Sequence, residues 1–426
     1  MKLLAKIVIR IKRGFLPYFT NETYKRGCEI HKLSLLSAEN GNDIFLLEIV
    51  YFNRNKFKGF LDKISKDEVN FQIISVKKVL EDEIRGGLLT VSGKTGLEDF
   101  NDYELHVLGA SGLIIDKMDE DDDKIKYSGI SKNVAIICGV DSRKNYINDL
   151  IKIHLSSEGD AVLINKFSGL NAFPIIIKFS FLEEFIKTLQ GIESTFSAIR
   201  ITYIKDIDEL FMYESIFPEI SIPMITQSYD EIPLYLLISI FHVLAKNKIE
   251  LKDNNIGLVG INVSALRITR LMIKLGCSRI LGYDNKEKLM LSFEKEGGLA
   301  TTQENIFNNS DIVIIFKEHF SIEDIQRAGP GQIIISLINS DLGLDVIQER
   351  GIKEFLHLEL IELSSLFPGI LRGIIENDQK YLSDTKIIDL AKKIFNMNSS
   401  QIEADNRILP ALFSDIHNRI PGFFDD

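Results

Sequence analysis

The first 80 residues switch repeatedly between a hydrophobic period of two and one of three to four, which predicts strands and helices in turn. Residues 40–42, Asn-Gly-Asn, are a strong hairpin signal between the two middle strands. The expected elements are strands at 3–11, 29–37, 43–51 and 69–79, with helices at about 15–26 and 56–64. This βαββαβ order is typical of the ferredoxin-like fold. We expect a first domain over residues 1–82, with the Gly-Gly pair at 86–87 at its boundary.

The rest of the chain alternates apolar runs with amphipathic segments, which indicates an α/β protein with mostly parallel sheets. In a second domain, residues 83–247, we expect strands at 133–139, 161–167, 175–179 and 199–204, and helices at 181–190, from 205 to 217, and at 232–246. In a third domain, residues 248–426, we expect strands at 256–259, 279–283, 312–316 and 332–336, and helices at 286–295, 322–328, 344–350 and 386–395. The last segment, RILPALFSDIHNRI, is expected to wrap back onto the body.

The clearest local signal runs from Ile256 to Asp284 and has the strand, turn, helix, strand order of a dinucleotide-binding unit. Such a turn needs glycine where the backbone bends or lies against a pyrophosphate at the helix N-terminus. Gly260 keeps the first glycine position, whereas Asn262 and Ala265 replace the second and third. Asp284, 24 residues after Gly260, stands where an acid binds a ribose hydroxyl, and its charge predicts NAD rather than NADP. The pattern favours a Rossmann-type domain and leaves open whether it holds a nucleotide.

Composition narrows the class of partner. The 426 residues suffice for two or three domains, and 45% hydrophobic with 26% charged residues is ordinary for a globular protein. A formal net charge of −11 argues against nucleic acid or an anionic membrane as partner. The longest uncharged apolar run, 232–245, is too short to span a bilayer, so we expect a cytoplasmic protein. Cys28, Cys138 and Cys277 are far apart in apolar surroundings, which predicts buried thiols.

Three separated segments resemble malic enzymes of the bacterial type that carries an N-terminal ACT domain. They are GDAVLINKFSGLNAFPI at 159–175, the Gly260 unit, and LFPGILRG at 366–373. The resemblance implies an ACT regulatory domain, a malic-enzyme substrate domain and a Rossmann-type NAD-binding domain, in that order. An ACT domain implies a small-molecule ligand or pairing between chains as a homo-oligomer. The alternative is a domain that serves only for packing.

The resemblance also implies a chemistry, in which a divalent metal ion and a nicotinamide cofactor convert malate to pyruvate and carbon dioxide. It needs a lysine and a tyrosine to move protons, and three carboxylates to hold Mg²⁺ or Mn²⁺. Here Asp160 stands at the lysine position and His106 at the tyrosine position. The metal positions are occupied by Thr202, Tyr203, Gln227 and Ser228. Cys138 stands at a threonine position after a strand of the second domain, and Leu363 at the position of a substrate-facing asparagine, while Asn339 matches an asparagine near the nicotinamide.

We therefore hypothesise a dinucleotide-binding or regulatory pseudoenzyme that keeps the fold but has lost oxidative decarboxylation. Asp160 in place of lysine puts an anion beside an anionic substrate, and neutral residues at the metal positions argue against a divalent metal. NAD is the expected cofactor. Two alternatives stay open: a metal-free NAD-dependent oxidoreductase acting on another small acid, and an NAD-dependent malic enzyme with altered active-site residues. His106 and Asp160 are also an alternative acid–base pair, if their segments meet.

Overall fold

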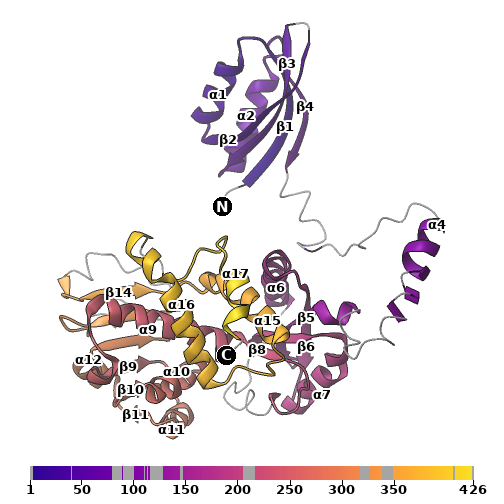
Figure 1. Cartoon of the computed structure of the whole chain (residues 1–426). Helices are drawn as coiled ribbons and strands as arrows, with labels where there is room; N and C mark the ends of the chain where they lie inside the picture. The colour runs from indigo at the N-terminus through magenta and orange to yellow at the C-terminus, as the bar shows by residue number, and fades with distance from the viewer. Residues whose placement is uncertain are drawn as a thin grey trace. The chain divides into compact units, whose positions relative to one another are not determined.

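The computed structural model describes residues 3–39, 41–78, 89, 100–109, 111–112, 114–115, 128–143, 147–204, 216–316, 326–337, 349–405 and 408–424. The chain divides into two compact units, residues 1–90 and 91–426 (Figure 1). Within the described ranges, none of the helices has the length and apolar character needed to cross a membrane. The helices expected at 205–217, 322–328 and 344–350 lie largely outside the described residues.

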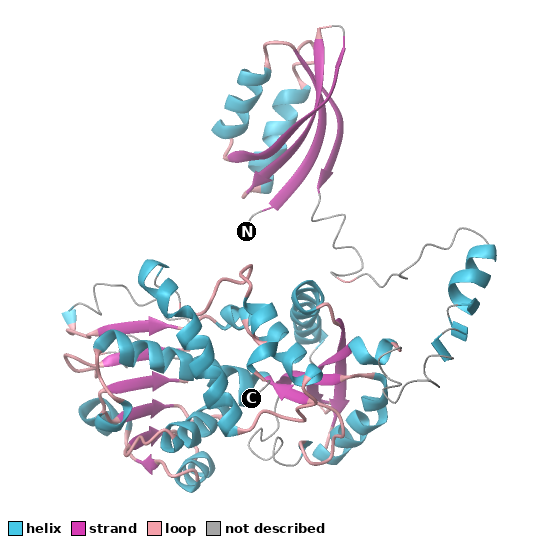
Figure 2. Ribbon diagram, in the orientation of Figure 1, coloured by secondary structure: helices cyan, strands magenta, loops and turns pink. Residues whose placement is uncertain are grey.

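The first unit is a four-stranded antiparallel sheet in the order β2-β3-β1-β4, with two helices covering one face (Figure 2). Its elements are β1 (Leu3–Lys12), α1 (Leu16–Lys25), β2 (Cys28–Glu39), β3 (Asn42–Tyr51), α2 (Arg54–Ser65) and β4 (Phe71–Lys78). The six elements expected from the hydrophobic pattern are all present. Their order and pairing are those of the ferredoxin-like arrangement.

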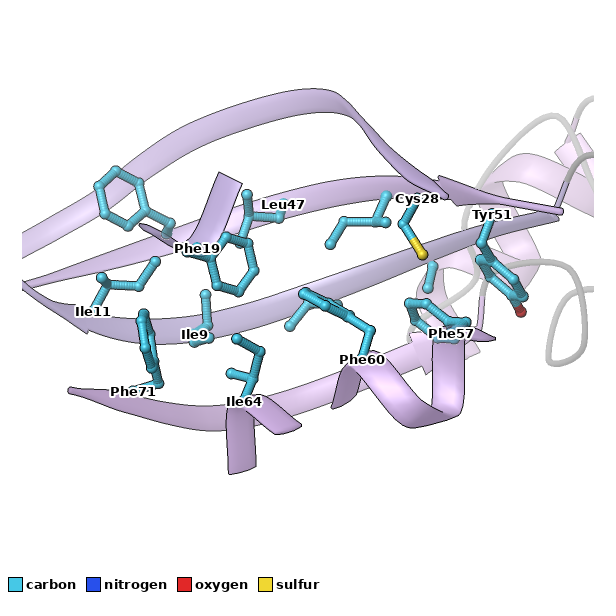
Figure 3. Packing of buried hydrophobic residues seen from close by; sticks show 14 of the residues in the cluster. Ile9, Ile11, Phe19, Cys28, Leu47, Tyr51, Phe57, Phe60, Ile64 and Phe71 are labelled. Carbon is cyan, nitrogen blue, oxygen red and sulfur yellow. The ribbon is translucent and has the colours of Figure 1, made fainter. Parts of the chain in front are cut away.

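The core of the first unit follows from the two periods of its sequence. Alternate residues of β1 are buried, from Leu3 to Ile11, because successive side chains of a strand point to opposite faces. In α2, Phe57, Phe60 and Ile64 share the buried face, as their helical spacing requires. Asn53 caps this helix by accepting hydrogen bonds from two backbone N–H groups, at 2.9 and 3.1 Å. Figure 3 shows Phe57, Phe60 and Ile64 beside the buried side chains of the strands.

The second unit contains a parallel sheet in the order β6-β5-β7-β8. The elements of this part are α4 (Phe100–Tyr103), η1 (Glu104–Gly109), η3 (Gly129–Lys132), β5 (Asn133–Asp141), α6 (Ile147–Ser168), β6 (Asn171–Phe179), α7 (Leu182–Ile192), η4 (Glu193–Thr195), β7 (Ala198–Ile204), β8 (Met224–Thr226), η5 (Gln227–Glu231), α9 (Ile232–Asn247) and η6 (Leu251–Asp253). The strand expected at 161–167 is wrong, because these residues belong to the helix α6. Ser157, Ala161 and Ile164 are buried at helical spacing, a pattern that a seven-residue window is too short to show.

A second parallel sheet, of six strands, has the order β11-β10-β9-β12-β13-β14. Its elements are β9 (Ile256–Val259), α10 (Val263–Lys274), β10 (Ile280–Tyr283), α11 (Glu287–Lys295), β11 (Leu299–Ala300), α12 (Gln303–Asn309), β12 (Ile312–Ile315), β13 (Ile333–Ser336) and β14 (Glu354–His357). Numbered from β9, this is the order 3-2-1-4-5-6 of the doubly wound dinucleotide-binding fold. The Rossmann-type architecture expected from the Gly260 unit is therefore present.

The C-terminal residues pack against other elements of the second unit. They form η7 (Leu360–Ser365), α15 (Phe367–Glu376), α16 (Asp384–Asp405), α17 (Ile416–Arg419) and η8 (Pro421–Phe423). The helix α16 packs against α9, and α15 packs against α6. Leu409 and Ile416 are buried, so the segment after α16 is held by apolar contacts.

Candidate functional site

A cavity of about 610 Å³ lies where α6, β7, η5, η7 and α15 meet. Its walls include four of the candidate residues from the sequence, namely Asp160, Thr202, Tyr203 and Gln227, as well as Cys138 and Leu363. Segments from residue 138 to residue 367 thus converge on one space. Its volume is in the range of small-molecule sites.

Ser228 is not among the described residues that line this cavity. The backbone carbonyl of Ser228 accepts a hydrogen bond from the Ser264 hydroxyl at 2.5 Å, which ties η5 to the start of α10. His106 belongs to η1, and its side chain lies outside what the structure describes. Asn339 is outside the described residues altogether. The pairing of His106 with Asp160 therefore stays a prediction.

The centre of the cavity wall is Arg200, a residue that the sequence analysis did not single out. It lies on β7, and its side chain is 1% exposed. Its Nε and Nη2 donate to the two carboxylate oxygens of Glu231, at 2.6 and 2.8 Å. Its Nη1 donates to Oδ2 of Asp160 at 2.6 Å. The acid at the expected lysine position is therefore paired with a guanidinium from the neighbouring strand.

The surroundings of Arg200 keep it charged. Burial lowers the pKa of its guanidinium, but the charges of Glu231 and Asp160 outweigh burial and hold the pKa above its ordinary value. The Arg200 Cζ atom lies 3.9 Å from the ring centroid of Phe367, the second residue of the LFPGILRG segment, which adds a cation–π contact. Buried charges are tolerated in proteins when they are paired in bidentate geometry and each partner is hydrogen-bonded, as Arg200 and Glu231 are.

Cys138 and Thr202 form a small polar group on the same wall. The Cys138 Sγ lies 3.1 Å from the hydroxyl oxygens of both Ser157 and Thr202. Burial raises the pKa of the Cys138 thiol, outweighing these two hydrogen bonds. The thiol is therefore kept neutral, as expected for a buried cysteine, and Cys28 and Cys277 are also buried and free.

The residues of this site do not fit a divalent metal ion. In the described part of the chain, no group of three or more His, Cys, Asp or Glu side chains is placed to hold one. The cavity carboxylate, Asp160, and its neighbour Glu231 already bind the Arg200 guanidinium. Mg²⁺ and Mn²⁺ prefer several anionic oxygens, whereas Asp160 supplies the one carboxylate among the described residues that line this cavity. We therefore assign no step to a metal ion.

The second part of the site is the turn between β9 and α10, at the switch point of the six-stranded sheet, where β9 pairs with both β10 and β12. Gly260 has φ +83°, a conformation that glycine adopts without strain. The backbone therefore bends at Gly260, as expected for the first glycine position of the turn. Asn262 does not use positive φ. Its backbone is extended, and its Oδ1 accepts the N–H of Ala265 at 2.9 Å as the N-cap of α10.

Asp284 supports this turn from the end of β10. Its two carboxylate oxygens accept the backbone N–H groups of Ile261 and Lys286, each at 2.9 Å. A carboxylate has about four lone-pair sites, so it can accept a ribose hydroxyl as well. Gly260 and Asp284 thus fit a dinucleotide, whereas Asn262 places its own oxygen on an N–H group that a phosphate would otherwise use.

Comparison with known proteins supports the family. No protein-family model matches the chain. NAD-dependent malic enzyme 1 of Bacillus subtilis is 23% identical over 240 residues, which cover 56% of this chain and 55% of that protein. NAD-dependent malic enzyme of Geobacillus stearothermophilus is 21% identical over 278 residues, or 60% of this chain and 58% of that protein. The crystal structure of malic enzyme from Pyrococcus horikoshii superposes with a TM-score of 0.66 at 19% identity, covering 79% of this chain and 85% of that one.

The chain is thus similar in sequence to malic enzymes and shares their fold. It spans little more than half the length of the curated malic enzymes that it matches. The solved malic enzyme shares its fold, which accounts for the parallel sheets and for the convergence of the cavity residues.

Arg200 and Glu231 are the residues that sequence reasoning missed. One signal for Arg200 was available, because an arginine inside the apolar strand sequence AIRITYI requires a buried acid nearby. Nothing local identifies Glu231 as that acid. It lies 31 residues away, beside Asp230 and after the short strand β8.

Proposed function

We propose that this chain is a malic-enzyme-like protein that binds a nicotinamide dinucleotide and does not carry out metal-dependent oxidative decarboxylation of malate. One observation carries the proposal. The guanidinium of Arg200 holds Asp160 and Glu231 at the site where the family resemblance implies a lysine and a metal ion. The proton transfers of that chemistry need a group near its own pKa at working pH, and a paired guanidinium does not supply one.

The charge around the cavity supports the same proposal. Malate is a dianion at neutral pH, and malic enzyme chemistry places it against cations. Here one guanidinium faces two carboxylates, so the three groups together carry a net charge of −1. Thr202, Tyr203 and Gln227 add no charge at neutral pH. Malate entering this space would lose its hydration, and it would find no cationic side chain free of an acidic partner to compensate for that loss.

The names of the relatives favour a second candidate, an NAD-dependent malic enzyme with altered active-site residues. One assay separates the two. The purified chain is given malate, NAD and Mn²⁺, and NADH formation is followed by absorbance, with the Bacillus subtilis relative as positive control. We expect no malate-dependent NADH above the no-enzyme rate. Turnover in the ordinary enzyme range, about 1–1,000 s⁻¹, would establish the second candidate and refute ours.

Nucleotide binding is tested separately. NAD is expected to raise the melting temperature of the chain, since a ligand that binds only the native state stabilises it. NADP should raise it less, because Asp284 would repel the 2′-phosphate. In the variant Asp284→Asn the difference between NAD and NADP should shrink. An equal or larger shift with NADP in the unmodified chain would contradict the assignment of Asp284.

The first unit is proposed as a regulatory domain of the ACT type, on the basis of its ferredoxin-like order and its place before a malic-enzyme body. The proposal includes a homo-oligomer, a small-molecule ligand for this unit and a cytoplasmic location. Light scattering after size-exclusion chromatography tests the oligomer: a mass of about 48.4 kDa, that of one chain, at micromolar concentration would contradict it.

A further inference from the structure

The cavity presents one charged group to a ligand, and that group is an acid. Among the described residues of its wall, Asp160 and Arg200 carry formal charge. The Arg200 side chain is 1% exposed and the Glu231 side chain behind it 0%, whereas the Asp160 side chain is 25% exposed. A molecule in the cavity therefore meets the carboxylate before the guanidinium.

Arg200 is not free to bind an anion in place of its partners. Three of its nitrogens already donate to carboxylate oxygens, at 2.6 to 2.8 Å, and its planar face lies on Phe367. A carboxylate ligand could reach the guanidinium only by displacing Asp160 and leaving that acid unpaired beside a second anion. Asp160, by contrast, uses its Oδ2 for Arg200 and keeps acceptor capacity on a carboxylate that has about four lone-pair sites.

The remainder of the wall is mostly apolar. Leu163, Leu360, Leu363 and Phe367 contribute carbon surface from α6, η7 and α15. Gln227 lines the same space with an amide that can accept or donate a hydrogen bond. The cavity thus combines one accessible anion with an apolar enclosure, which is the arrangement that suits a small amphipathic cation.

We propose that this cavity binds a small monocation, namely an ammonium group on a hydrocarbon body, with Asp160 as its counter-ion. The ammonium donates to the Asp160 carboxylate, and the hydrocarbon body packs on the leucines and Phe367. This inference rests on the proposed function, because a cavity that seats malate and a metal ion would need the opposite preference in ligand charge. It goes further by naming the class of ligand that the cavity accepts.

The test uses three probes that share one hydrocarbon body and differ in charge: 3-methylbutylamine, 3-methylbutan-1-ol and 3-methylbutanoate. Their binding to the full chain is measured by isothermal titration calorimetry at pH 7.5, without malate, metal ion or nucleotide. We expect the amine to bind at least about tenfold more tightly than the alcohol or the carboxylate, the effect of one charge-assisted hydrogen bond. A carboxylate that binds as tightly as the amine would overturn the proposal.

Two variants assign the effect to the cavity. Asp160→Asn should bring the affinity for the amine close to that for the alcohol. Glu183→Gln makes the same charge change at an exposed position of α7 and should leave the ranking unchanged. An amine affinity that is unaffected in Asp160→Asn would refute the role of Asp160. If Asp160→Asn fails to fold, the ranking of the three probes on the unmodified chain still decides.

The result is independent of the activity assay. Malate turnover together with the expected ranking would refute the proposed function alone. Absence of turnover together with tighter binding of 3-methylbutanoate would refute the ligand class alone.

Discussion

Arg200 stands on β7 between isoleucines, and its guanidinium is held by Glu231 on one side and by Asp160 on the other. Removing one partner of a buried ion pair leaves the other charge without compensation, at a cost of about 3–5 kcal/mol. We therefore expect Arg200→Met to lower the free energy of unfolding by that amount, measured in urea. Arg200→Met combined with Glu231→Gln should recover most of the loss. Equal destabilisation of the single and double variants would contradict the pair.

Asp230, the neighbour of Glu231, predicts a dependence of stability on pH. Its side chain is fully buried, and in the described structure its Oδ1 has no hydrogen-bond partner. Its Oδ2 accepts the N–H and the hydroxyl of Thr226, at 2.8 and 3.1 Å. Burial raises its pKa from 3.8 to about 7, against the opposing influence of Arg267 and Thr226.

The sign follows from which state holds the proton. Between pH 4 and pH 7 the unfolded Asp230 has lost its proton while the folded one keeps it. The stability that this group contributes is therefore present at low pH and is lost as the pH rises towards 7, by on the order of 4 kcal/mol. The free energy of unfolding in urea should fall less between pH 5 and pH 8 in Asp230→Asn than in the unmodified chain. Asp253→Asn, at an exposed acid, is the control, and an unchanged loss in Asp230→Asn would refute the assignment.

The residues at the site were predictable to different degrees. Asp160, Thr202, Tyr203 and Gln227 come from three separate segments whose order the family resemblance supplies, and the structure brings them around one cavity. The salt bridge that sets the charge of that cavity was not predictable, because Glu231 and Arg200 meet only when β7 and β8 pair. A resemblance identifies the positions where a family carries function. The resemblance does not show which new contacts the residues at those positions make when the family's functional residues are absent.

At the scale of elements, the start of α10 determines how well the chain can hold a nucleotide. Asn262 caps this helix through Ala265 N–H. Asn262→Ala should therefore lower the free energy of unfolding by about 1 kcal/mol, whereas Asn262→Gly should lower it by only a few tenths. Asn262→Gly also removes the side chain from the position next to a bound phosphate.

The same variant tests the nucleotide site. With the Ala265 N–H freed for a phosphate oxygen, NAD should bind about tenfold more tightly to Asn262→Gly, which corresponds to one hydrogen bond to a charged group at about 1.4 kcal/mol. Fluorescence titration of the variant against the unmodified chain measures the ratio. An equal or weaker affinity in Asn262→Gly would show that the cap does not compete with the nucleotide.

Hydrophobic periodicity predicted the secondary-structure elements well where they are long and amphipathic. The strands and helices of the first unit were predicted with small differences at their ends, and so was the strand–helix–strand motif from β9 to β10. The apolar run at 161–167 was misassigned because a short run fits both a buried strand and the buried face of a helix. The strands β8, β11 and β14 were missed, since β8 and β11 have three and two residues and none of the four residues of β14 is fully buried.

At the scale of the whole molecule, alternation of strands and helices predicted parallel sheets, and the Gly260 motif located the first strand of the larger one. The order of the six strands then follows from the rule that doubly wound sheets grow outward from that strand. The cavity did not follow from any such rule. It is closed by α15 and η7, from the C-terminal part of the chain; α15 contacts α6 and β7, and η7 contacts α15 and α9.

The division into two units leads to a last prediction, on folding. Every buried member of the first unit's core lies between Leu3 and Phe71, so this core is complete without the second unit. Residues 1–90 should therefore fold alone and unfold cooperatively. In the full chain, NAD should raise the unfolding temperature of the second unit and leave that of the first unchanged, because the proposed nucleotide site lies at the six-stranded sheet.

A pair of substitutions assigns the transition of the first unit. Phe57 is 2% exposed and stacks on Tyr51 with ring centroids 4.1 Å apart, so Phe57→Ala should lower the stability of that transition by about 3–5 kcal/mol. Tyr24, on α1, is 79% exposed, and Tyr24→Ala should change it by less than about 0.5 kcal/mol. Calorimetry of the full chain separates the two transitions. If calorimetry shows a single transition whose temperature changes both with NAD and with Phe57→Ala, the two units unfold together as one cooperative unit, and the prediction is wrong.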